Sequence, residues 1–175
     1  MNKKLFWQII AQSRDEFDPD LQSGNMDRQL DRLYDLLSGL DPRETIFFDM
    51  IFHQLLAESY RWDLWGAAYI ISEGMCSDDS FDYFRSWLIS MGQEFYENAL
   101  KNPDSLADSA GQPGIEDIFF EEFAHVASNV YMEKTEEDMP DPHISLPASP
   151  LGDQWQEEPA DLSRRFPKLW AKFGW

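Results

Sequence analysis

The 175-residue sequence contains one cysteine, Cys76, and no Asn-X-Ser/Thr glycosylation acceptor. A lone cysteine cannot form a disulfide within the chain, whereas small secreted domains commonly depend on several. The sequence also lacks the run of about 20 apolar residues that an α-helix needs to cross a bilayer. Gln8, Gln12 and Arg14 interrupt the apolar start of the chain, and no small-residue cleavage site follows it. We therefore expect a cytoplasmic protein that does not bind membranes.

Positive charge is scarce. Lysine and arginine together number 14 against 33 aspartates and glutamates, which gives a formal net charge of -19. Such a charge repels nucleic-acid phosphates and anionic lipids, so we expect no direct nucleic-acid binding. The excess of acidic residues extends through the whole chain and is not confined to a tail. It either provides solubility through self-repulsion or forms an acidic surface that matches a basic partner.

Motifs for metal binding and catalysis are also missing. His53, His125 and His143 are isolated from one another, and Glu122 and His125 form a single Glu-x-x-His pair where a dimetal bundle needs two. There is no Gly-x-Ser-x-Gly motif and no glycine-rich phosphate loop. Cys76 precedes a predicted helix, but no nearby base accompanies it, so a buried structural cysteine is favoured. We predict no metal, no cofactor and no catalytic residue, and the sequence leaves open whether the protein is an enzyme.

Aromatic and aliphatic residues are abundant. Hydrophobic residues make up 43% of the chain and aromatic residues 15%, which excludes a disordered chain. The apolar residues recur at steps of three and four, and no segment alternates as a strand would. Asp41 is expected to cap a helix that has Pro42 at its first position and Glu44 reaching back to the cap. Helices are predicted to cover approximately residues 5–14, 25–38, 42–56, 62–71, 78–91, 95–101, 115–134 and 161–173.

Five prolines interrupt this pattern near the end of the chain, at positions 140, 142, 147, 150 and 159. This density is incompatible with a helix and predicts an extended strap over the helical body. Ile144, Leu146, Leu151 and Trp155 are its expected anchors, and Asp161 is expected to cap the last helix. The predicted fold is an all-α, single-domain helical bundle. It comprises a body at residues 1–134, a Pro-rich strap at 135–160 and a docked C-terminal helix at 161–175.

The densest group of chemically versatile side chains surrounds the start of the helix predicted at 78–91. Asp82 and Arg85 are three residues apart, so they can pair along one helix face. The favoured interpretation is a helix cap with ion pairs that hold an aromatic core. The alternative is a ligand pocket lined by Trp62, Trp65, Asp79 and Arg85. The candidate pocket residues are Trp62, Trp65, Asp78, Asp79, Asp82 and Arg85.

A second candidate site is an acidic face on the helix predicted at 115–134. Four carboxylates share its first turns: Glu116, Asp117, Glu121 and Glu122. The tail at 163–173 has the opposite character, with four basic residues and no acidic one. In a chain of this net charge, we expect the tail to dock on the protein's own acidic surface and not on a membrane.

Several stretches resemble the bacterial domain family of unknown function DUF4240, and together they span nearly the whole chain. The most specific of them is Asp-Asp-x-Phe-x-x-Phe-Arg-x-Trp-Leu, at residues 78–88. The resemblance carries no established activity or catalytic residue, and related domains that occur within larger regulatory chains suggest an interaction module. The stretches that carry the resemblance are Phe6-Trp7, Trp65–Ile71, Ser77–Ile89, Asn102–Leu106 and Phe166–Leu169.

These observations favour a non-catalytic interaction protein that binds a basic partner. Its most concrete form is an immunity or antitoxin-like protein that neutralises a basic toxin. The alternative is a small-ligand-binding or enzymatic domain that uses the pocket around Trp62, Asp79 and Arg85. The sequence identifies neither the partner nor the oligomeric state.

Overall fold

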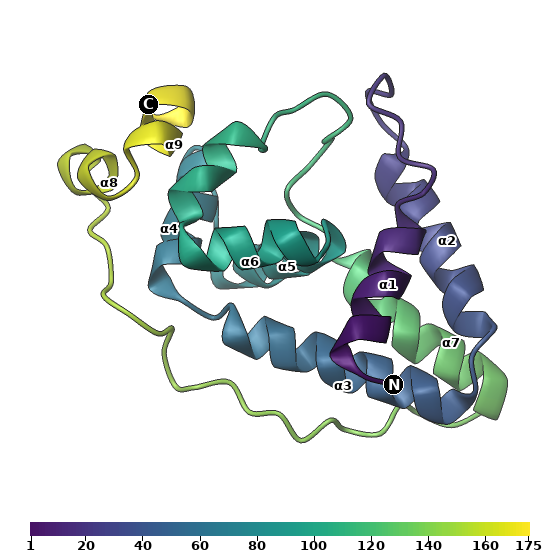
Figure 1. Ribbon diagram of the computed structural model, residues 1–175. Coiled ribbons are helices and arrows are strands. Elements are labelled where there is room, and N and C mark those ends of the chain that lie inside the picture. Colours follow the sequence, from purple (N-terminus) through teal and green to yellow (C-terminus); the bar gives the residue numbers. More distant parts are fainter.

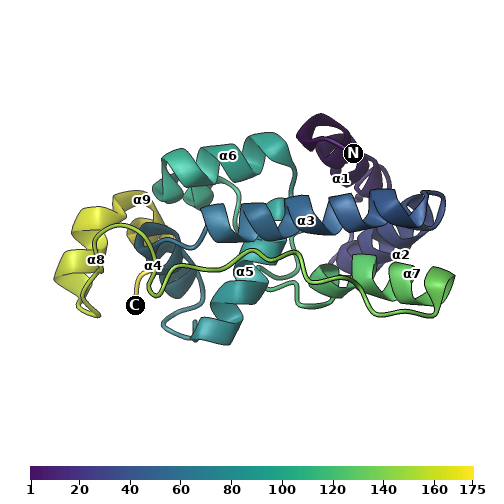
Figure 2. The ribbon, with the colours of Figure 1, turned by 90° about the horizontal axis from the view of Figure 1, so that it is seen from below.

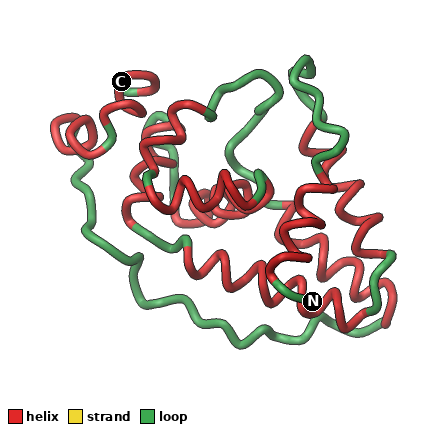
Figure 3. Tube along the Cα trace, in the orientation of Figure 1, coloured by secondary structure: helices red, strands yellow, loops and turns green.

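The computed structural model describes residues 1–175 as nine α-helices and two 3-10 helices, without a β-sheet (Figures 1 and 3). The predicted all-α fold is confirmed. No helix combines the length and the apolar character that crossing a membrane requires. The elements are α1 (Lys3–Ser13), α2 (Asn25–Ser38), α3 (Pro42–Glu58), α4 (Trp62–Ile71), α5 (Asp78–Ser90), α6 (Gln93–Lys101), η1 (Pro103–Asp108), η2 (Glu122–His125), α7 (Val126–Thr135), α8 (Pro159–Arg165) and α9 (Pro167–Phe173).

Helix α3 forms the axis of the molecule. Helices α1, α2 and α7 pack around its N-terminal half, and α4, α5 and α6 gather toward its C-terminal end (Figure 2). Helices α8 and α9 lie beyond α4, where α9 contacts both α4 and η1. One hydrophobic cluster of 34 buried residues includes side chains from all nine α-helices. The strap contributes one residue to it, Trp155.

The start of α3 follows the sequence prediction in part. Asp41 caps the helix, because the N–H of Arg43 donates to its Oδ1 (2.9 Å), and Pro42 occupies the first position. The predicted return of Glu44 to the cap is wrong. Its carboxylate pairs instead with the amino group of Met1 (2.6 Å) and so ties the start of the chain to α3.

The helix predicted over 115–134 is wrong in its first third. Residues 115–121 are not helical, and η2 and α7 follow them. Asp117 Oδ1 accepts hydrogen bonds from the N–H groups of Ile118 (2.6 Å) and Phe119 (3.1 Å). The N–H of Phe120 donates to the carbonyl of Tyr83 (3.1 Å) in α5. These contacts replace the helical hydrogen bonds, as short acidic side chains commonly do at turns.

The strap is an extended segment over residues 136–158 that passes along α3 and reaches α4 (Figure 2). Its backbone is fixed at Leu151, whose N–H donates to Tyr60 O (2.9 Å) and whose carbonyl accepts from the N–H of Trp62 (2.9 Å). Trp155 is buried as predicted, but the side chains of Leu146 and Leu151 are about half exposed (46% and 53%). Their prediction as apolar anchors is wrong, because Leu151 holds the strap through its backbone.

The single C-terminal helix predicted from Asp161 is two helices, α8 and α9, which Phe166 and Pro167 separate. Asp161 lies inside α8 and does not cap it. Its Oδ2 accepts from the N–H of Gln156 (2.8 Å), and its carboxylate pairs with Arg164 and Arg165.

Asp104 provides the cap of α9 from a distant part of the chain. Its carboxylate accepts hydrogen bonds from the N–H groups of Lys168 (3.1 Å) and Leu169 (2.9 Å). The Lys172 ammonium donates to the carbonyls of Ala107 and Ala110 (both 2.8 Å). The tail therefore docks on η1 mainly through backbone N–H groups and carbonyls, and Lys168 with Asp108 (3.6 Å) is an exposed ion pair between them.

Gly66 marks the closest approach between the C-terminal segment and α4. A Cβ atom at this position would lie 2.7 Å from Phe166 Cε2 and 2.9 Å from Trp155 Cδ1. We expect Gly66→Ala to lower the free energy of unfolding by about 1–3 kcal/mol, because the two rings must move. Gly39→Ala is the control, since its Cβ would meet no atom closer than 3.5 Å. Urea unfolding of both variants measures the difference, and equal stability of the two would contradict this packing.

The contacts of Asp161 also predict a pH dependence. The N–H of Gln156 and the two arginines lower the pKa of Asp161 from 3.8 to about 2. Because the pKa is lower in the folded state, its stabilising contribution is complete above pH 3.8 and is lost as the pH falls through 2. We expect a carboxyl ¹³C titration to place the midpoint of Asp161 near 2. A midpoint at 3.8 or above would show that these contacts do not form in solution.

Candidate functional site

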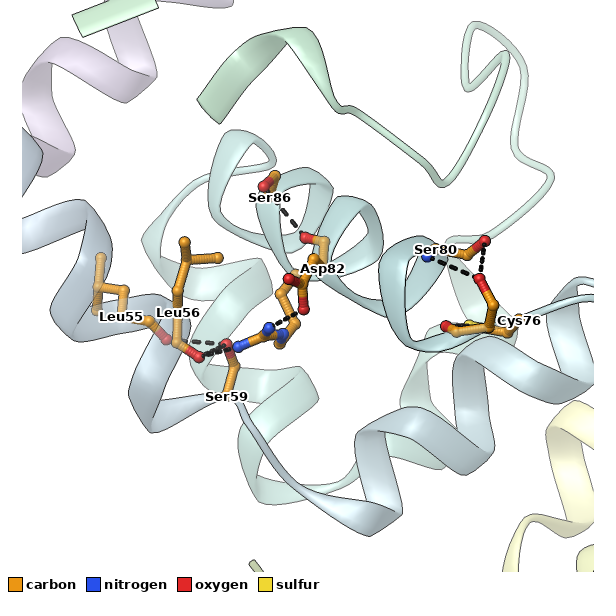
Figure 4. A network of polar contacts seen from close by, with 9 residues as sticks. Leu55, Leu56, Ser59, Cys76, Ser80, Asp82 and Ser86 are labelled. Atoms are coloured by element: carbon orange, nitrogen blue, oxygen red, sulfur yellow. Dashed lines mark hydrogen bonds and ion pairs between the residues drawn. The ribbon is translucent and has the colours of Figure 1, made fainter. Parts of the chain in front are cut away.

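Arg85 in α5 is buried, with a residue exposure of 1%. Its guanidinium carbon lies 5.0 Å from the ring centre of Tyr60 and 5.1 Å from that of Phe81, within cation–π range. Nη1 donates to the carbonyl of Leu56 (2.6 Å), and Nη2 pairs with the carboxylate of Asp82 (Figure 4). The predicted pairing of Asp82 with Arg85 is confirmed.

The carbonyls that end α3 are the focus of this network. The hydroxyl of Tyr96 in α6 donates to Leu55 O (2.6 Å), and Ser59 Oγ donates to the same oxygen (2.8 Å). Burial raises the pKa of the Tyr96 hydroxyl above its usual value, so it stays protonated as a donor. Leu55 O also accepts from the N–H of Ser59 (3.0 Å) and Leu56 O from Ser59 Oγ (3.1 Å), so side chains from α5 and α6 add further hydrogen bonds to carbonyls at the end of α3.

Arg85 therefore belongs to the packing of three helices and not to a ligand pocket. Asp78 and Asp79 are exposed in the first turn of α5, where they complement the helix dipole. Ser77 caps that helix by accepting from the N–H of Ser80 (3.2 Å). The pocket that Trp62 and Trp65 line includes none of Asp78, Asp79, Asp82 and Arg85, so the structure does not bring the predicted pocket residues together in one cavity.

An aromatic pocket does exist beside α4. It has a volume of about 530 Å³ and is lined by Trp62, Trp65, Tyr69, Cys76 and residues 154–157 of the strap. The sequence identified Trp62 and Trp65 but missed Tyr69, Trp155 and Glu157. A pairing between α4 and the strap has no periodic sequence signal that could have revealed it. We call this feature the aromatic pocket.

Cys76 forms part of the wall of the aromatic pocket. Its carbonyl accepts a hydrogen bond from Trp65 Nε1 (3.0 Å). Burial raises the pKa of its thiol to about 12, so the group is protonated at neutral pH. This agrees with a structural cysteine and not with a nucleophile.

A groove lined by carboxylates lies between the N-terminal part of α2 and the segment at 116–122. Its volume is about 540 Å³, and no lysine, arginine or histidine lines it. We call it the acidic groove. Its acidic members are Asp27, Glu116, Asp117 and Glu122, and its apolar members are Met26, Leu30, Phe119 and Phe120.

Three of the four residues predicted for the acidic face line this groove, although they do not share a helix. Glu116 caps α2 from outside, because its two oxygens accept from the N–H groups of Gly24 and Met26 (both 2.6 Å). Glu121 lies outside the groove, where it raises the pKa of the Tyr83 hydroxyl by accepting its hydrogen bond. Sequence reasoning missed Asp27, whose first-turn position in α2 was its only signal.

The histidines lie apart from both features. Asp49 raises the pKa of His53 through a hydrogen bond to its ring, in which Nδ1 lies 3.3 Å from Asp49 Oδ2. His143 is exposed on the strap beside Asp141. No group of three or more His, Cys, Asp or Glu side chains is arranged to hold a metal ion.

Comparison with known proteins places the chain in a family. The model of the protein family of unknown function DUF4240 matches residues 1–133 of the 175. The chain belongs to this family. No curated protein and no solved structure matches the chain significantly. The DUF4240 match ends within α7, so Phe166–Leu169, which the sequence resemblance included, lies outside it.

The DUF4240 region contains the whole acidic groove and the Arg85 network. The aromatic pocket is different, because α4 and Cys76 lie inside the matched region while residues 154–157 lie outside it. The pocket is therefore built jointly by the DUF4240 region and the C-terminal segment.

The Arg85 network yields a stability prediction. We expect Arg85→Ala to lower the free energy of unfolding by about 2–4 kcal/mol, since it leaves a cavity and removes the shorter of two hydrogen bonds to Leu56 O. Arg61→Ala is the matched control, because its ion pair with Asp63 (3.1 Å) is partly exposed and is worth less than about 1 kcal/mol. Denaturant unfolding compares the two. Equal losses would contradict the role of Arg85 in joining α3 to α5.

Proposed function

We propose that this DUF4240 protein is a non-catalytic interaction protein whose acidic groove binds a basic segment of a partner protein. The observation that carries the proposal is the groove itself, which four carboxylates and four apolar side chains line without a lysine, arginine or histidine. A segment with lysine or arginine beside an apolar residue complements both parts of this surface.

The charge of the rest of the molecule supports the same proposal. With a net charge of -19, the protein attracts cationic proteins over distances of about a Debye length, roughly 8–10 Å at 0.1–0.15 M salt. Long-range attraction raises the rate of encounter, and the groove then provides shape and apolar contact. The most concrete form of this function is an immunity or antitoxin-like protein that binds a basic toxin.

Charge reversal within the groove tests this function. Asp27→Lys combined with Glu122→Lys changes two groove carboxylates that accept no hydrogen bond in the structure. Glu116 and Asp117 are unsuitable, because they cap α2 and the turn at 118–119. We expect the double variant to keep its fold and to weaken partner binding at least about tenfold.

The matched control is Asp153→Lys combined with Glu158→Lys, which changes the net charge equally on exposed residues outside the groove. A partner captured on the immobilised protein is identified, purified and titrated against both double variants at about 0.05 and 0.3 M salt. If both double variants weaken binding equally, the effect is due to net charge and not to the groove. Binding that responds to neither would overturn the proposed function.

A further inference from the structure

The aromatic pocket has walls of an unusual composition. Four aromatic side chains line it together with one carboxylate, and no basic residue is present. Trp62, Trp65 and Tyr69 come from α4, and Trp155 and Glu157 come from the strap. The acidic groove involves none of these residues, so ligand binding in the aromatic pocket is independent of the proposed function.

The rings form a corner. Trp65 stacks on Trp62 (centroids 5.3 Å apart, 10° between planes) and on Phe81 (4.9 Å, 11°). Trp62 ends this stack and meets Trp155 nearly at right angles (6.5 Å, 83°). Tyr69 lies against Trp155 with centroids 4.6 Å apart. Two perpendicular tryptophan rings thus border one cavity of about 530 Å³.

The carboxylate of the pocket remains open to a ligand. Glu157 is exposed, and its one hydrogen-bond partner in the protein is the Tyr69 hydroxyl at 3.4 Å. No cationic side chain forms a salt bridge with it. Trp155 Nε1 is buried without a hydrogen-bond partner, although buried indole N–H groups usually have one.

We propose that the aromatic pocket binds a small quaternary ammonium compound. The faces of tryptophan rings carry negative electrostatic potential, so they attract a cation placed between them. Glu157 adds a full negative charge at the same pocket. The volume lies within the range of about 300–1,000 Å³ that is typical of small-ligand sites.

The methylated form of the cation is preferred for a physical reason. A primary ammonium needs up to three hydrogen-bond acceptors when it leaves water. The ring faces provide none, and the side-chain acceptors of the pocket are limited to the Tyr69 hydroxyl and the strap residues Gln154, Gln156 and Glu157. A quaternary ammonium has no N–H group, so it loses little hydration and buries its methyl groups against the rings. The chemistry of the walls therefore selects a trimethylammonium group.

Titration with choline tests the proposal, with the neutral isostere 3,3-dimethylbutan-1-ol as the ligand control. The indole N–H signals of Trp62, Trp65 and Trp155 are followed by NMR, and those of Trp7 and Trp87, which do not line the pocket, serve as internal references. We expect choline to shift the pocket signals with saturation below about 10 mM and to bind at least about tenfold more tightly than the isostere.

Two neighbouring glutamates provide a matched pair of variants. Glu157→Gln removes the carboxylate of the pocket, whereas Glu158→Gln removes an equally exposed charge that does not line it. We expect only Glu157→Gln to weaken choline binding, by about three- to tenfold. Trp62→Leu is expected to abolish binding, and circular dichroism establishes that its helices are retained.

Each of three results would overturn the proposal. The first is the absence of saturable shifts at the pocket tryptophans up to about 10 mM choline. The second is equal affinity for choline and its neutral isostere, which would show that the charge is not recognised. The third is an equal effect of Glu157→Gln and Glu158→Gln, which decides the question even if Trp62→Leu fails to fold.

Discussion

The guanidinium of Arg85 lies over the rings of Tyr60 and Phe81, at the point where α3 ends. A charge in this position is costly unless it is paired and hydrogen-bonded, and Leu56 and Asp82 supply both kinds of contact. The same helix end receives the Tyr96 hydroxyl from α6. The packing of α3, α5 and α6 therefore gives Nη1 and Nη2 of Arg85 and the Tyr96 hydroxyl their partners, while Arg85 Nε stays buried without one. Helix α4 begins directly after this helix end.

Part of the large negative charge has a structural purpose. Glu116 caps α2 and Asp104 caps α9, in each case across more than 60 residues of sequence. Asp161 organises α8 through two arginines and a backbone amide. An acidic side chain at a helix N-terminus or beside an arginine is stabilised by its surroundings. Asp27 and Glu122 stand in the first turns of α2 and η2 but form no ion pair, so under the proposed function they are the groove carboxylates available to a basic ligand.

Local signals in the sequence predicted most of the fold. The helices through α6 were identified from three signals: the Asp41-Pro42 start, the Ser77 cap and the apolar spacing of three and four residues. Each of these signals depends only on neighbours within one helical turn. The segment at 115–121 was mispredicted, since its conformation depends on a hydrogen bond to Tyr83 O and on Glu116 reaching α2. Long-range contacts of this kind have no periodicity in the sequence.

The candidate sites, too, were predicted where contacts are local in sequence and missed where they are long-range. Helical spacing alone predicted that Trp62 and Trp65 lie together on α4 and that Asp82 pairs with Arg85. Whether Arg85 faced a pocket or the core depended on how α3 and α5 pack, which spacing does not determine. The other wall of the aromatic pocket comes from the strap, about 90 residues away, where prolines set the path of the backbone.

The most direct test of the acidic groove as a binding surface is to map the partner on the protein by NMR. Backbone amide shifts are recorded while the purified basic partner is added. If the acidic groove binds the partner, the largest changes in amide chemical shift fall within residues 22–30 and 116–122, where the groove is formed. Changes confined to other surfaces, with these two segments unaffected, would contradict it.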